Sequence, residues 1–528
     1  MRVTLESVLV SAWVVLLASP RVAEAAGECD CTFVIEPDVG SFDGVEQGVS
    51  AGDSICVRGG AREFLRFYNL IGASDQWIDV HNCEGSVDIS NEDRGYGLTA
   101  DGSRYFRISG SGDPGVELGF RVRAARTGPD YAASGVVVGG LSSDYELDHM
   151  EVYETGFAGF SLKTEPTCDL TANLGNFVQY DTRLHHNWIH DTGGEGIYFG
   201  STGYGGREYQ CDGQTVVLHP HEHHGAQIHH NLIEDTGWDG AQVGVTPVDC
   251  RVWGNLIRDV GLGGVQYQQQ GLQIGGGSQC EIWGNRLERG PANGIFILQA
   301  ATTIVHDNLI VDFAETGIYA NDDDSFAGER YVFVHNTVLR SGGWGLAIFG
   351  TQIVDNLGWN NLVLESGMAD IAPGGDVDWD GQNNITGIGV NEAGFVDPDA
   401  GDFHLLPDSI AIAAGKPALE WTTADLDGVA RDPATPDVGA YEWTDQPPPS
   451  DTGSDTSDGG WTAGDDLPGE VGTDEVGDTG DTGANADTSG CSCSTHDAGG
   501  VGTTIFACFG LLLVGQLGSR PRRAPRVG

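Results

Sequence analysis

The chain has 528 residues, a formal net charge of −51 at pH 7 and only two lysines, Lys163 and Lys416. This acidic surplus argues against nucleic acid as a partner and against a bare polyanion, because both are bound by surfaces rich in Lys and Arg. We therefore expect partners that are neutral, cationic or bridged by a metal ion. The length would allow three domains, but a single solenoid that grows along one axis can also reach it.

The first 25 residues have the features of a secretory signal peptide. Arg2 is followed by an apolar run over residues 8–18 and by the small-residue site Ala23-Glu24-Ala25. The sequence therefore predicts export, which would allow the cysteines to form disulfides. Residues 26–123 contain short strand-like runs between Gly-rich turns, and we expect them to form N-terminal coils and a cap.

Between residues 124 and 390 one short phrase recurs, an Asn followed by a short apolar run. The repeated asparagines are Asn187, Asn231, Asn255, Asn285, Asn308 and Asn336, at spacings of 23 to 44 residues. Each is followed by a Gly and an alternating apolar run, at 196–199, 240–243, 264–267, 294–297, 317–320 and 345–348. The spacing is too short for a βαβ unit, so it predicts a parallel β-helix in which stacked asparagines hydrogen-bond from coil to coil. A β-sandwich is the alternative, but it needs no Asn register.

This repeat resembles the right-handed parallel β-helix of the pectate-lyase-like superfamily. The resemblance covers most of the mature chain and implies an all-β solenoid. It does not imply one activity, because proteins of this fold include polysaccharide lyases, glycoside hydrolases, epimerases and adhesive surface proteins.

Three disulfide bridges are predicted. Cys250 and Cys280 each lie five residues before a repeated Asn, so they should stack in neighbouring coils about 4.8 Å apart, a spacing that suits a disulfide. The two further pairs are Cys56–Cys83, in a similar arrangement, and Cys168–Cys211, which would close an inserted loop. Buried free thiols are the alternative for each pair.

The strand after each repeated Gly should turn alternate residues inward and outward. Apolar residues fill the first and third positions, so the second and fourth should face outward. The outward residues that we expect to bind sugar are Tyr198, Gln242, Gln266, Gln268, Phe296 and Tyr319. Rings stack on sugar faces and amides bond hydroxyls, so this stripe predicts a carbohydrate groove. An ordinary solvated face with scattered rings is the alternative.

Two carboxylates precede this strand in consecutive coils. The stretches 191–196 and 235–240 align without a gap, so Glu195 and Asp239 should lie roughly 5 Å apart. Such a pair suits a retaining glycosidase, as acid and nucleophile, or a shared calcium ion. In a calcium-assisted β-elimination, Tyr198 or a histidine would take the proton. Capping of the local turn is the structural alternative, and we prefer it for Asp191 and Asp235.

Other candidates for chemistry lie near this pair. We interpret the stretch containing His221, His223 and His224 as an insertion outside the repeat, free to supply a general base or to bind a transition metal, although it contains no HExxH spacing. Lys163 should lie about 16 Å from the carboxylates and so be a poor base. Two acidic residues at the groove edge, Asp322 and Asp323, are candidates for a weak calcium site.

The chain ends in three further segments. Residues 391–443 should form closing coils and a cap, and residues 444–490 are an acidic linker whose composition predicts disorder. Residues 491–528 contain Cys491 and Cys493, a short apolar run and an Arg cluster. That order resembles the tail of MYXO-CTERM proteins, which implies sorting to the cell surface and processing near the cysteines. A plain membrane anchor is the alternative.

The sequence therefore favours an exported, surface-anchored β-helix that binds polysaccharide, with cleavage by hydrolysis or β-elimination as an open hypothesis. Calcium is the expected cofactor, and a transition metal at the histidines is the weaker alternative. The expected partners are a glycan and the machinery that sorts and processes the tail, with the membrane reached only through that tail. The competing class is a non-catalytic adhesin in which Glu195 and Asp239 bind structural calcium only.

Overall fold

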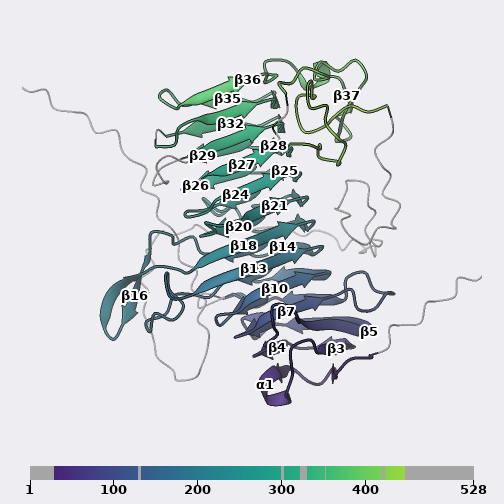
Figure 1. Ribbon diagram of the computed structural model, residues 1–528, viewed down its shortest axis with the longest axis vertical. Helices are drawn as coiled ribbons and strands as arrows, with labels where there is room; N and C mark the ends of the chain where they lie inside the picture. Colours follow the sequence, from purple (N-terminus) through teal and green to yellow (C-terminus); the bar gives the residue numbers. More distant parts are fainter. Residues whose placement is uncertain are drawn as a thin grey trace, which may run out of the picture.

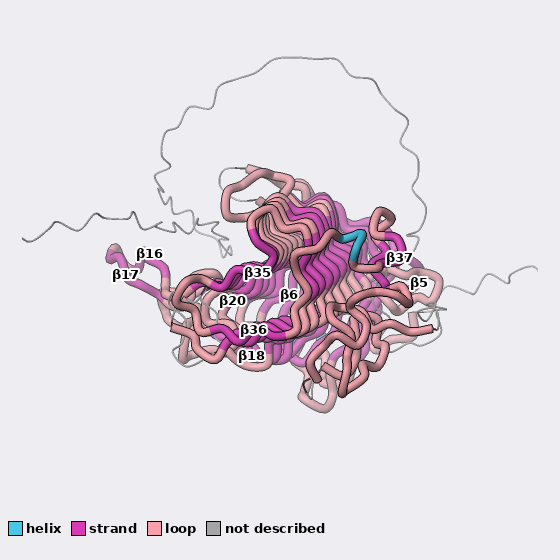
Figure 2. The backbone as a smooth tube through the Cα atoms, turned by 90° about the horizontal axis from the view of Figure 1, so that it is seen from above, coloured by secondary structure: helices cyan, strands magenta, loops and turns pink. Residues whose placement is uncertain are grey.

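The computed structural model describes residues 29–128, 132–298, 302–321, 330–350, 352–417, 419 and 422–445. The signal peptide, nearly all of the acidic linker and the tail with Cys491 and Cys493 lie outside these residues. In the described part the chain winds into parallel coils that stack along the long axis (Figure 1). Seen down this axis, the strands of successive coils lie over one another (Figure 2). The predicted all-β solenoid is confirmed, and no described helix is long and apolar enough to cross a membrane.

The coils build two large sheets of parallel strands. One sheet has twelve strands: β2 (Ser41–Asp43), β4 (Leu65–Tyr68), β6 (Tyr96–Asp101), β9 (Ser134–Gly139), β12 (Phe160–Leu162), β15 (Ile197–Gly200), β20 (Ala241–Gly244), β23 (Leu272–Ile274), β26 (Ile295–Leu298), β29 (Ile318–Asn321), β32 (Trp344–Phe349) and β35 (Ala369–Pro373). We call it the 12-stranded sheet. Its inward residues join one continuous hydrophobic core that runs through the coils.

The other sheet has 22 strands in two rows, which the long strands β3 and β5 join near the N-terminal end. The first row contains β1 (Phe33–Ile35), β3 (Ser54–Arg62), β5 (Ile78–Asn91), β7 (Arg104–Ser109), β10 (Ser143–Asp148), β13 (Val178–His185), β18 (Glu222–His229), β21 (Cys250–Trp253), β24 (Cys280–Trp283), β27 (Thr303–His306), β30 (Tyr331–Val334), β33 (Asn356–Trp359) and β36 (Trp379–Gln382). The second row contains β8 (Phe120–Ala124), β11 (Met150–Thr155), β14 (Trp188–Thr192), β19 (Leu232–Glu234), β22 (Leu256–Arg258), β25 (Arg286–Gly290), β28 (Leu309–Phe313), β31 (Thr337–Leu339) and β34 (Leu362–Leu364).

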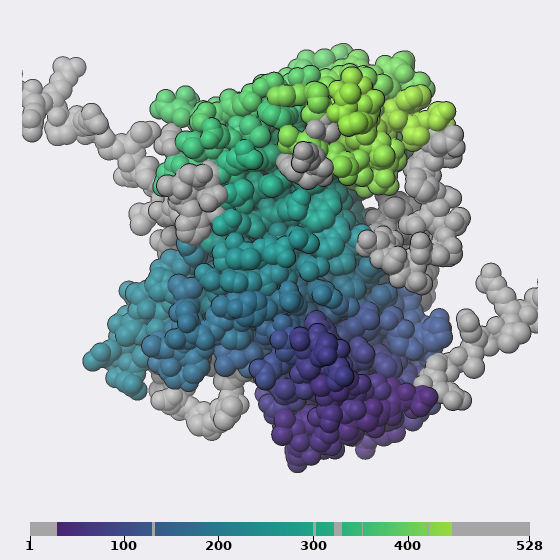
Figure 3. All heavy atoms as spheres, in the orientation of Figure 1, coloured from purple at the N-terminus to yellow at the C-terminus, as the bar shows by residue number. Residues whose placement is uncertain are grey.

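Four small elements lie outside these sheets. They are the helix α1 (Gly44–Gln47), the 3-10 turn Val390–Glu392, the hairpin of β16 (Arg207–Cys211) with β17 (Gln214–Leu218), and the hairpin of β37 (Phe395–Asp397) with β38 (Asp402–Leu405). The first hairpin is inserted between β15 and β18 and projects from the body (Figures 1 and 3).

The repeated asparagines form the predicted ladder between the two rows of the 22-stranded sheet. From Asn187 to Asn384, each side-chain amide donates to the Oδ1 of the Asn in the next coil at 2.9–3.0 Å. The residue before each Asn has a positive φ, for example 51° at His230 and 62° at Gly254. The turn therefore requires Gly or a residue that tolerates the left-handed region, which explains why the residue before each Asn varies from coil to coil.

The repeated Gly before each strand of the 12-stranded sheet marks a crowded corner. A Cβ at Gly196 would lie 2.5 Å from both Ile233 Cγ2 and the carbonyl oxygen of Gly240 in the next coil. The same clash would occur at Gly240 and Gly294. Only Gly lets the chain turn here against the core of the coil above, so the Gly period follows from packing.

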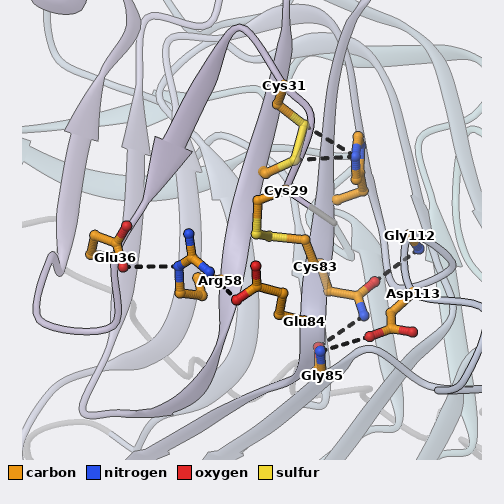
Figure 4. The surroundings of a disulfide bond; sticks show 12 residues. Cys29, Cys31, Glu36, Arg58, Cys83, Glu84, Gly85, Gly112 and Asp113 are labelled. Carbon is orange, nitrogen blue, oxygen red and sulfur yellow. Dashed lines mark hydrogen bonds and ion pairs between the residues drawn. A yellow bond between two sulfur atoms is a disulfide. The ribbon is translucent and has the colours of Figure 1, made fainter. Parts of the chain in front are cut away.

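Four disulfides staple the described chain. Cys250–Cys280 and Cys168–Cys211 form as predicted. The predicted Cys56–Cys83 bridge is wrong, because Cys56 bonds Cys31 and Cys83 bonds Cys29. The register explains the error: Cys83 lies opposite Arg58, two residues beyond Cys56, and the segment before β1 brings its own two cysteines alongside. Figure 4 shows the Cys29–Cys83 bridge beside Arg58, Glu84 and the Gly85–Asp113 hydrogen bond.

The segment from Val390 to Trp443 packs against the side of the last coils. Its apolar residues form a second core with outward residues of β28, β31 and β34, among them Leu309 and Leu362. Arg431 anchors the segment, because its fully buried guanidinium lies 2.6 Å from Asp307 and 3.1 Å from Glu442. Closing coils were expected here, but the described residues of the segment lie beside the solenoid and add no further coil (Figure 1).

Candidate functional site

One outward line of residues runs in register across the middle of the 12-stranded sheet. Consecutive strands β12, β15, β20, β23, β26 and β29 pair through Ser161, Tyr198, Gln242, Gln273, Phe296 and Tyr319. Their neighbours on each strand face the core, so this line faces away from it. We call these six residues the outer stripe. It contains four of the six residues predicted to bind sugar.

Gln266 and Gln268 do not belong to the stripe. The sequence repeats a Gly-x-Gln-x pattern at 264–267 and 271–274, and the structure makes β23 from the second copy. Gly271 lies at the crowded corner, whereas a Cβ at Gly264 would meet nothing within 4 Å. Gln266 is therefore exposed in a loop, and Gln273 takes the place predicted for it.

The stripe changes character along the solenoid. Ser161, Tyr198, Gln242 and Gln273 are buried, and the Nε2 of Gln242 has no hydrogen-bond partner. Phe296 and Tyr319 are half-buried, with ring centroids 5.1 Å apart. The ring of Phe349, on the next strand, lies 5.6 Å from that of Tyr319. The outer stripe is therefore polar and covered at the Ser161 end and aromatic and accessible at the Tyr319 end.

Lys163 lies at the covered end of the outer stripe, two residues after Ser161 and on the same face of the sheet. Its Nζ is 2.6 Å from Glu165 Oε1 and 3.8 Å from the centroid of the Tyr198 ring. Burial acts to lower the pKa of Lys163, but Tyr198 and Glu165 outweigh it and the pKa is raised. Lys163 is therefore a cation held on Tyr198. Its raised pKa makes Lys163 a poor base, and its charge acts to lower the pKa of Glu195.

Glu195 and Asp239 occupy equivalent positions in consecutive coils, as predicted. They are 2% and 0% exposed. Burial raises the pKa of Glu195 to about 7, partly offset by its own backbone N–H and by Lys163. Burial also raises the pKa of Asp239 well above its usual value, and the charge of Glu195 adds to that rise. Burial therefore holds a proton on both carboxyls more tightly than on exposed ones, and Glu195 is largely neutral in mildly acidic solution.

Asp239 also belongs to a second buried ladder that the sequence reasoning missed. Its Oδ1 accepts from the backbone N–H of Gln270 at 2.7 Å, Gln270 Oε1 accepts from Asn293 at 2.8 Å, and Asn293 Oδ1 accepts from the N–H of Thr316 at 3.2 Å. Each of these residues directly precedes a corner Gly. The sequence could therefore have indicated this ladder once the corner glycines were correctly assigned. Glu195 stands at the open end of this ladder, and its Oε2 has no partner.

The histidines predicted as a free loop belong to the solenoid. His223 and His224 lie on β18, and the insertion ends before them with β17. His221 is buried and fixed, since its Nε2 accepts from the N–H of Thr164 at 3.2 Å and its Nδ1 lies 3.1 Å from the carbonyl of Glu222. His223 faces Phe199 of the core, with ring centroids 4.8 Å apart. Burial lowers the pKa of both His221 and His223, so both are neutral, and their ring centroids lie 4.5 Å apart.

Two groups of three potential metal ligands occur in the described residues, and neither contains a predicted ligand. In the first, both sulfurs belong to the Cys31–Cys56 disulfide. In the second, Glu146 and Asp148 already contact Arg107 at 2.9 and 2.7 Å. Asp322 and Asp323 lie outside the described residues. Glu195 and Asp239 supply one unpartnered oxygen each, Oε2 and Oδ2.

A family model described as a right-handed β-helix region matches residues 214–386. The fold is a right-handed parallel β-helix. Solved structures similar to this chain include a pectate lyase, with a TM-score of 0.46 and 13% identity over 78% of this chain and 97% of that one. A lacto-N-biosidase from Eubacterium ramulus has a TM-score of 0.39 and 12% identity over 65% and 62% of the two chains, and an alginate lyase from Paenibacillus has 0.33 and 15% over 66% and 100%. These likenesses concern the fold alone. No curated protein matches the sequence.

Proposed function

We propose that this protein binds polysaccharide along the outer stripe. The observation that supports this most directly is the register, because five consecutive strands present Tyr198, Gln242, Gln273, Phe296 and Tyr319 at one position. At about 4.8 Å per coil, the line is about 19 Å long. An extended glycan on it would stack sugar faces on the two accessible rings, and it would meet the buried amides of Gln242 and Gln273 only where covering side chains move.

The test of binding uses the full chain and a panel of soluble polysaccharides, with retardation in affinity gels as the measurement. Phe296→Ala and Tyr319→Ala should each weaken retardation about tenfold, because a stacked ring contributes about 1 kcal/mol or more. Trp283→Ala is the matched control, since Trp283 lies on the 22-stranded sheet in the strand β24. Equal loss in all three variants, or retardation by no polysaccharide, would contradict the proposal.

Cleavage is the second candidate function, and Glu195 is the residue that favours it. A carboxyl with a pKa of about 7 and an unpartnered oxygen is suited to give a proton to a glycosidic oxygen. Asp239 is less suited to act as its nucleophile, because one oxygen is held by Gln270 and burial raises its pKa, which disfavours the ionised form. Because Glu195 is 2% exposed, cleavage needs covering side chains to move, whereas binding at Phe296 and Tyr319 does not.

The test of cleavage measures reducing ends and unsaturated products released by the full chain from each polysaccharide that binds, with and without calcium. If the protein cleaves, Glu195→Gln should abolish release while leaving retardation in affinity gels unchanged. Unsaturated products would identify elimination, and their absence would identify hydrolysis. A protein that binds polysaccharide but releases no product would support the adhesin class and not the enzyme.

Calcium at Glu195 and Asp239 is a further part of the proposal. An ion there would have to displace the protons that burial favours, so it should bind and stabilise the fold only above pH 7. Thermal unfolding with and without calcium at pH 6 and pH 8 measures this. Equal stabilisation by calcium in wild type and in the Glu195→Gln variant would assign the ion to another site.

Export and surface anchoring also remain proposals. Four disulfides in the described chain support folding in an oxidising compartment, because such bridges are rare in the cytosol. Protease treatment of intact cells should then remove the solenoid, and a Cys491→Ala, Cys493→Ala variant should change how the protein is retained. Protection of the chain until cells are broken would contradict display at the cell surface.

A further inference from the structure

We infer that the glycan recognised by the outer stripe is uncharged and is not a uronic acid polymer. This inference rests on the proposed function and specifies its substrate class. It comes from the charges that the 12-stranded sheet presents on its outer face and from those that it lacks.

The first observation is the scarcity of cations on this face. From β12 to β32, the described outward positions contain one cation, Lys163. The others are Ser161, Tyr198, Gly200, Gln242, Gly244, Gln273, Gly275, Phe296, Leu298, Tyr319, Asn321, Ala347 and Phe349. A polymer with one carboxylate per sugar would therefore find a single positive side chain on these strands. Beside them, Arg207 of the β16–β17 hairpin contacts Thr202, whose hydroxyl lies 3.5 Å from that of Tyr198, and its charge acts to lower the pKa of Glu165.

That single cation is already neutralised. Lys163 is 8% exposed, its Nζ lies 2.6 Å from Glu165, and it rests on the ring of Tyr198. The same pairing lowers the pKa of Glu165 against the effect of burial, so the carboxylate stays ionised. A uronate that reached Lys163 would have to displace Glu165 and leave that carboxylate, whose side chain is 24% exposed, without its cation.

The second observation is the sign of the surroundings. The whole chain has 77 acidic residues against 26 basic ones. A polyanion would therefore be repelled on approach.

The arginines of the solenoid offer no substitute, because their largest cluster faces elsewhere. Arg258, Arg289 and Arg340 line a hollow of about 310 Å³ at the second row of the 22-stranded sheet. Each is within 2.6–2.7 Å of a carboxylate, those of Glu234, Asp259 and Asp312 respectively. Positive charge on this protein is thus used to hold the fold together, not to line the outer stripe.

The accessible groups of the stripe suit neutral sugars. Phe296 and Tyr319 are half-buried, and a ring pair of this kind favours the apolar face of a pyranose. Gln242 is 1% exposed, so its unpartnered Nε2 meets a glycan only where covering side chains move.

The experiment compares polymers that share a backbone and differ in charge. Two such pairs are methyl-esterified pectin with polygalacturonate, and hydroxyethyl cellulose with carboxymethyl cellulose. They are added, within a broad panel of neutral and anionic polysaccharides, to the full chain at about 0.15 M salt, and the dissociation constants are measured by calorimetry. In every pair that binds, the uncharged member should bind at least about tenfold more tightly. The difference should shrink in about 1 M salt, where the Debye length falls to about 3 Å.

A designed variant tests the cause. Asn321→Arg adds a cation at an outward, half-buried position of β29, and it should improve binding of the anionic member several-fold. Ile304→Arg, at a half-buried position of β27 in the other sheet, adds the same charge and should not. Equal or tighter binding of anionic members by the wild type would overturn the inference while the proposed function stood. Binding of neither class would instead overturn the proposed function.

Discussion

Glu195 and Asp239 lie in the same position of consecutive coils, but only Asp239 is tied to the next coil by a hydrogen bond. The sequence alignment made them an equivalent pair, and the structure separates their roles. Asp239 supports the backbone of Gln270, whereas Glu195 keeps an unpartnered oxygen beside the charge of Lys163. Substitutions at the two positions should therefore have different consequences.

The first prediction concerns the pH dependence of stability. Burial raises the pKa of Glu195 from its ordinary 4.5 to about 7, so the folded state holds this proton more tightly than the unfolded state. The stability that follows is complete below pH 4.5 and is lost as the pH rises through 7. Glu195→Gln should therefore increase the free energy of unfolding by about 3 kcal/mol at pH 8 and leave it nearly unchanged at pH 4.

Denaturant titrations of wild type and variant at pH 4, 6 and 8 measure this difference. Glu315→Gln serves as control, because Glu315 is an exposed carboxylate near the far end of the same ladder. A difference between Glu195→Gln and wild type that does not change with pH would show that Glu195 is not held neutral.

The second prediction separates the two oxygens of Asp239. Asp239→Ala removes the acceptor of the Gln270 N–H and should cost about 1–3 kcal/mol in unfolding free energy. Asp239→Asn keeps an acceptor oxygen at that place and should cost less. Thermal unfolding at pH 6 provides the comparison, and equal losses in the two variants would argue against the ladder as the source of the stability.

The third prediction concerns the Asn ladder. Asn255 donates to the carbonyls of Ile228 and Trp253 and to Asn285, and its Oδ1 accepts from Asn231. Asn255→Ala should leave several buried groups unpaired and cost about 2–5 kcal/mol. At the half-buried end of the ladder, Asn384→Ala should cost markedly less. Similar midpoints of denaturation for the two variants would contradict a ladder whose strength lies in its buried middle.

The fourth prediction concerns the Cys250–Cys280 bridge, which closes a loop of 30 residues between neighbouring coils. A double Ala variant should lose about 3–4 kcal/mol by the chain-entropy relation. Denaturation of the oxidised wild type, the reduced wild type and the variant measures the loss. The variant should lie between the oxidised and the reduced wild type, because reduction also breaks the other three bridges, and an unchanged variant would show that the stacked coils alone fix this register.

Much of the fold could be predicted because packing in a solenoid repeats. The Asn turn and the corner Gly each answer a local steric or hydrogen-bonding need, so they recur in the sequence at every coil. The same regularity identified Tyr198, Gln242, Phe296 and Tyr319 as one line. The prediction failed at Gly264 and Gly271, which begin two similar stretches of sequence. Only the folded structure shows which of the two glycines lies at a crowded corner.

The candidate site was harder to predict than the fold. Register placed Glu195 beside Asp239, but burial and the contact of Lys163 with Tyr198 depend on side chains from several coils, which no pattern records. The insertion was also misplaced, since His223 and His224 look polar and mobile in sequence while β18 contains them both. The Cys56–Cys83 error arose similarly, because two cysteines before β1 compete for the same partners.

The most direct test of the account is hydrogen–deuterium exchange of the full chain with and without a bound neutral polysaccharide. A glycan bound along the outer stripe should slow exchange in β20, β23, β26 and β29. Exchange in β21, β24 and β27 of the other sheet should stay unchanged. Slower exchange confined to the 22-stranded sheet, or no change at saturating polysaccharide, would contradict a glycan bound along the outer stripe.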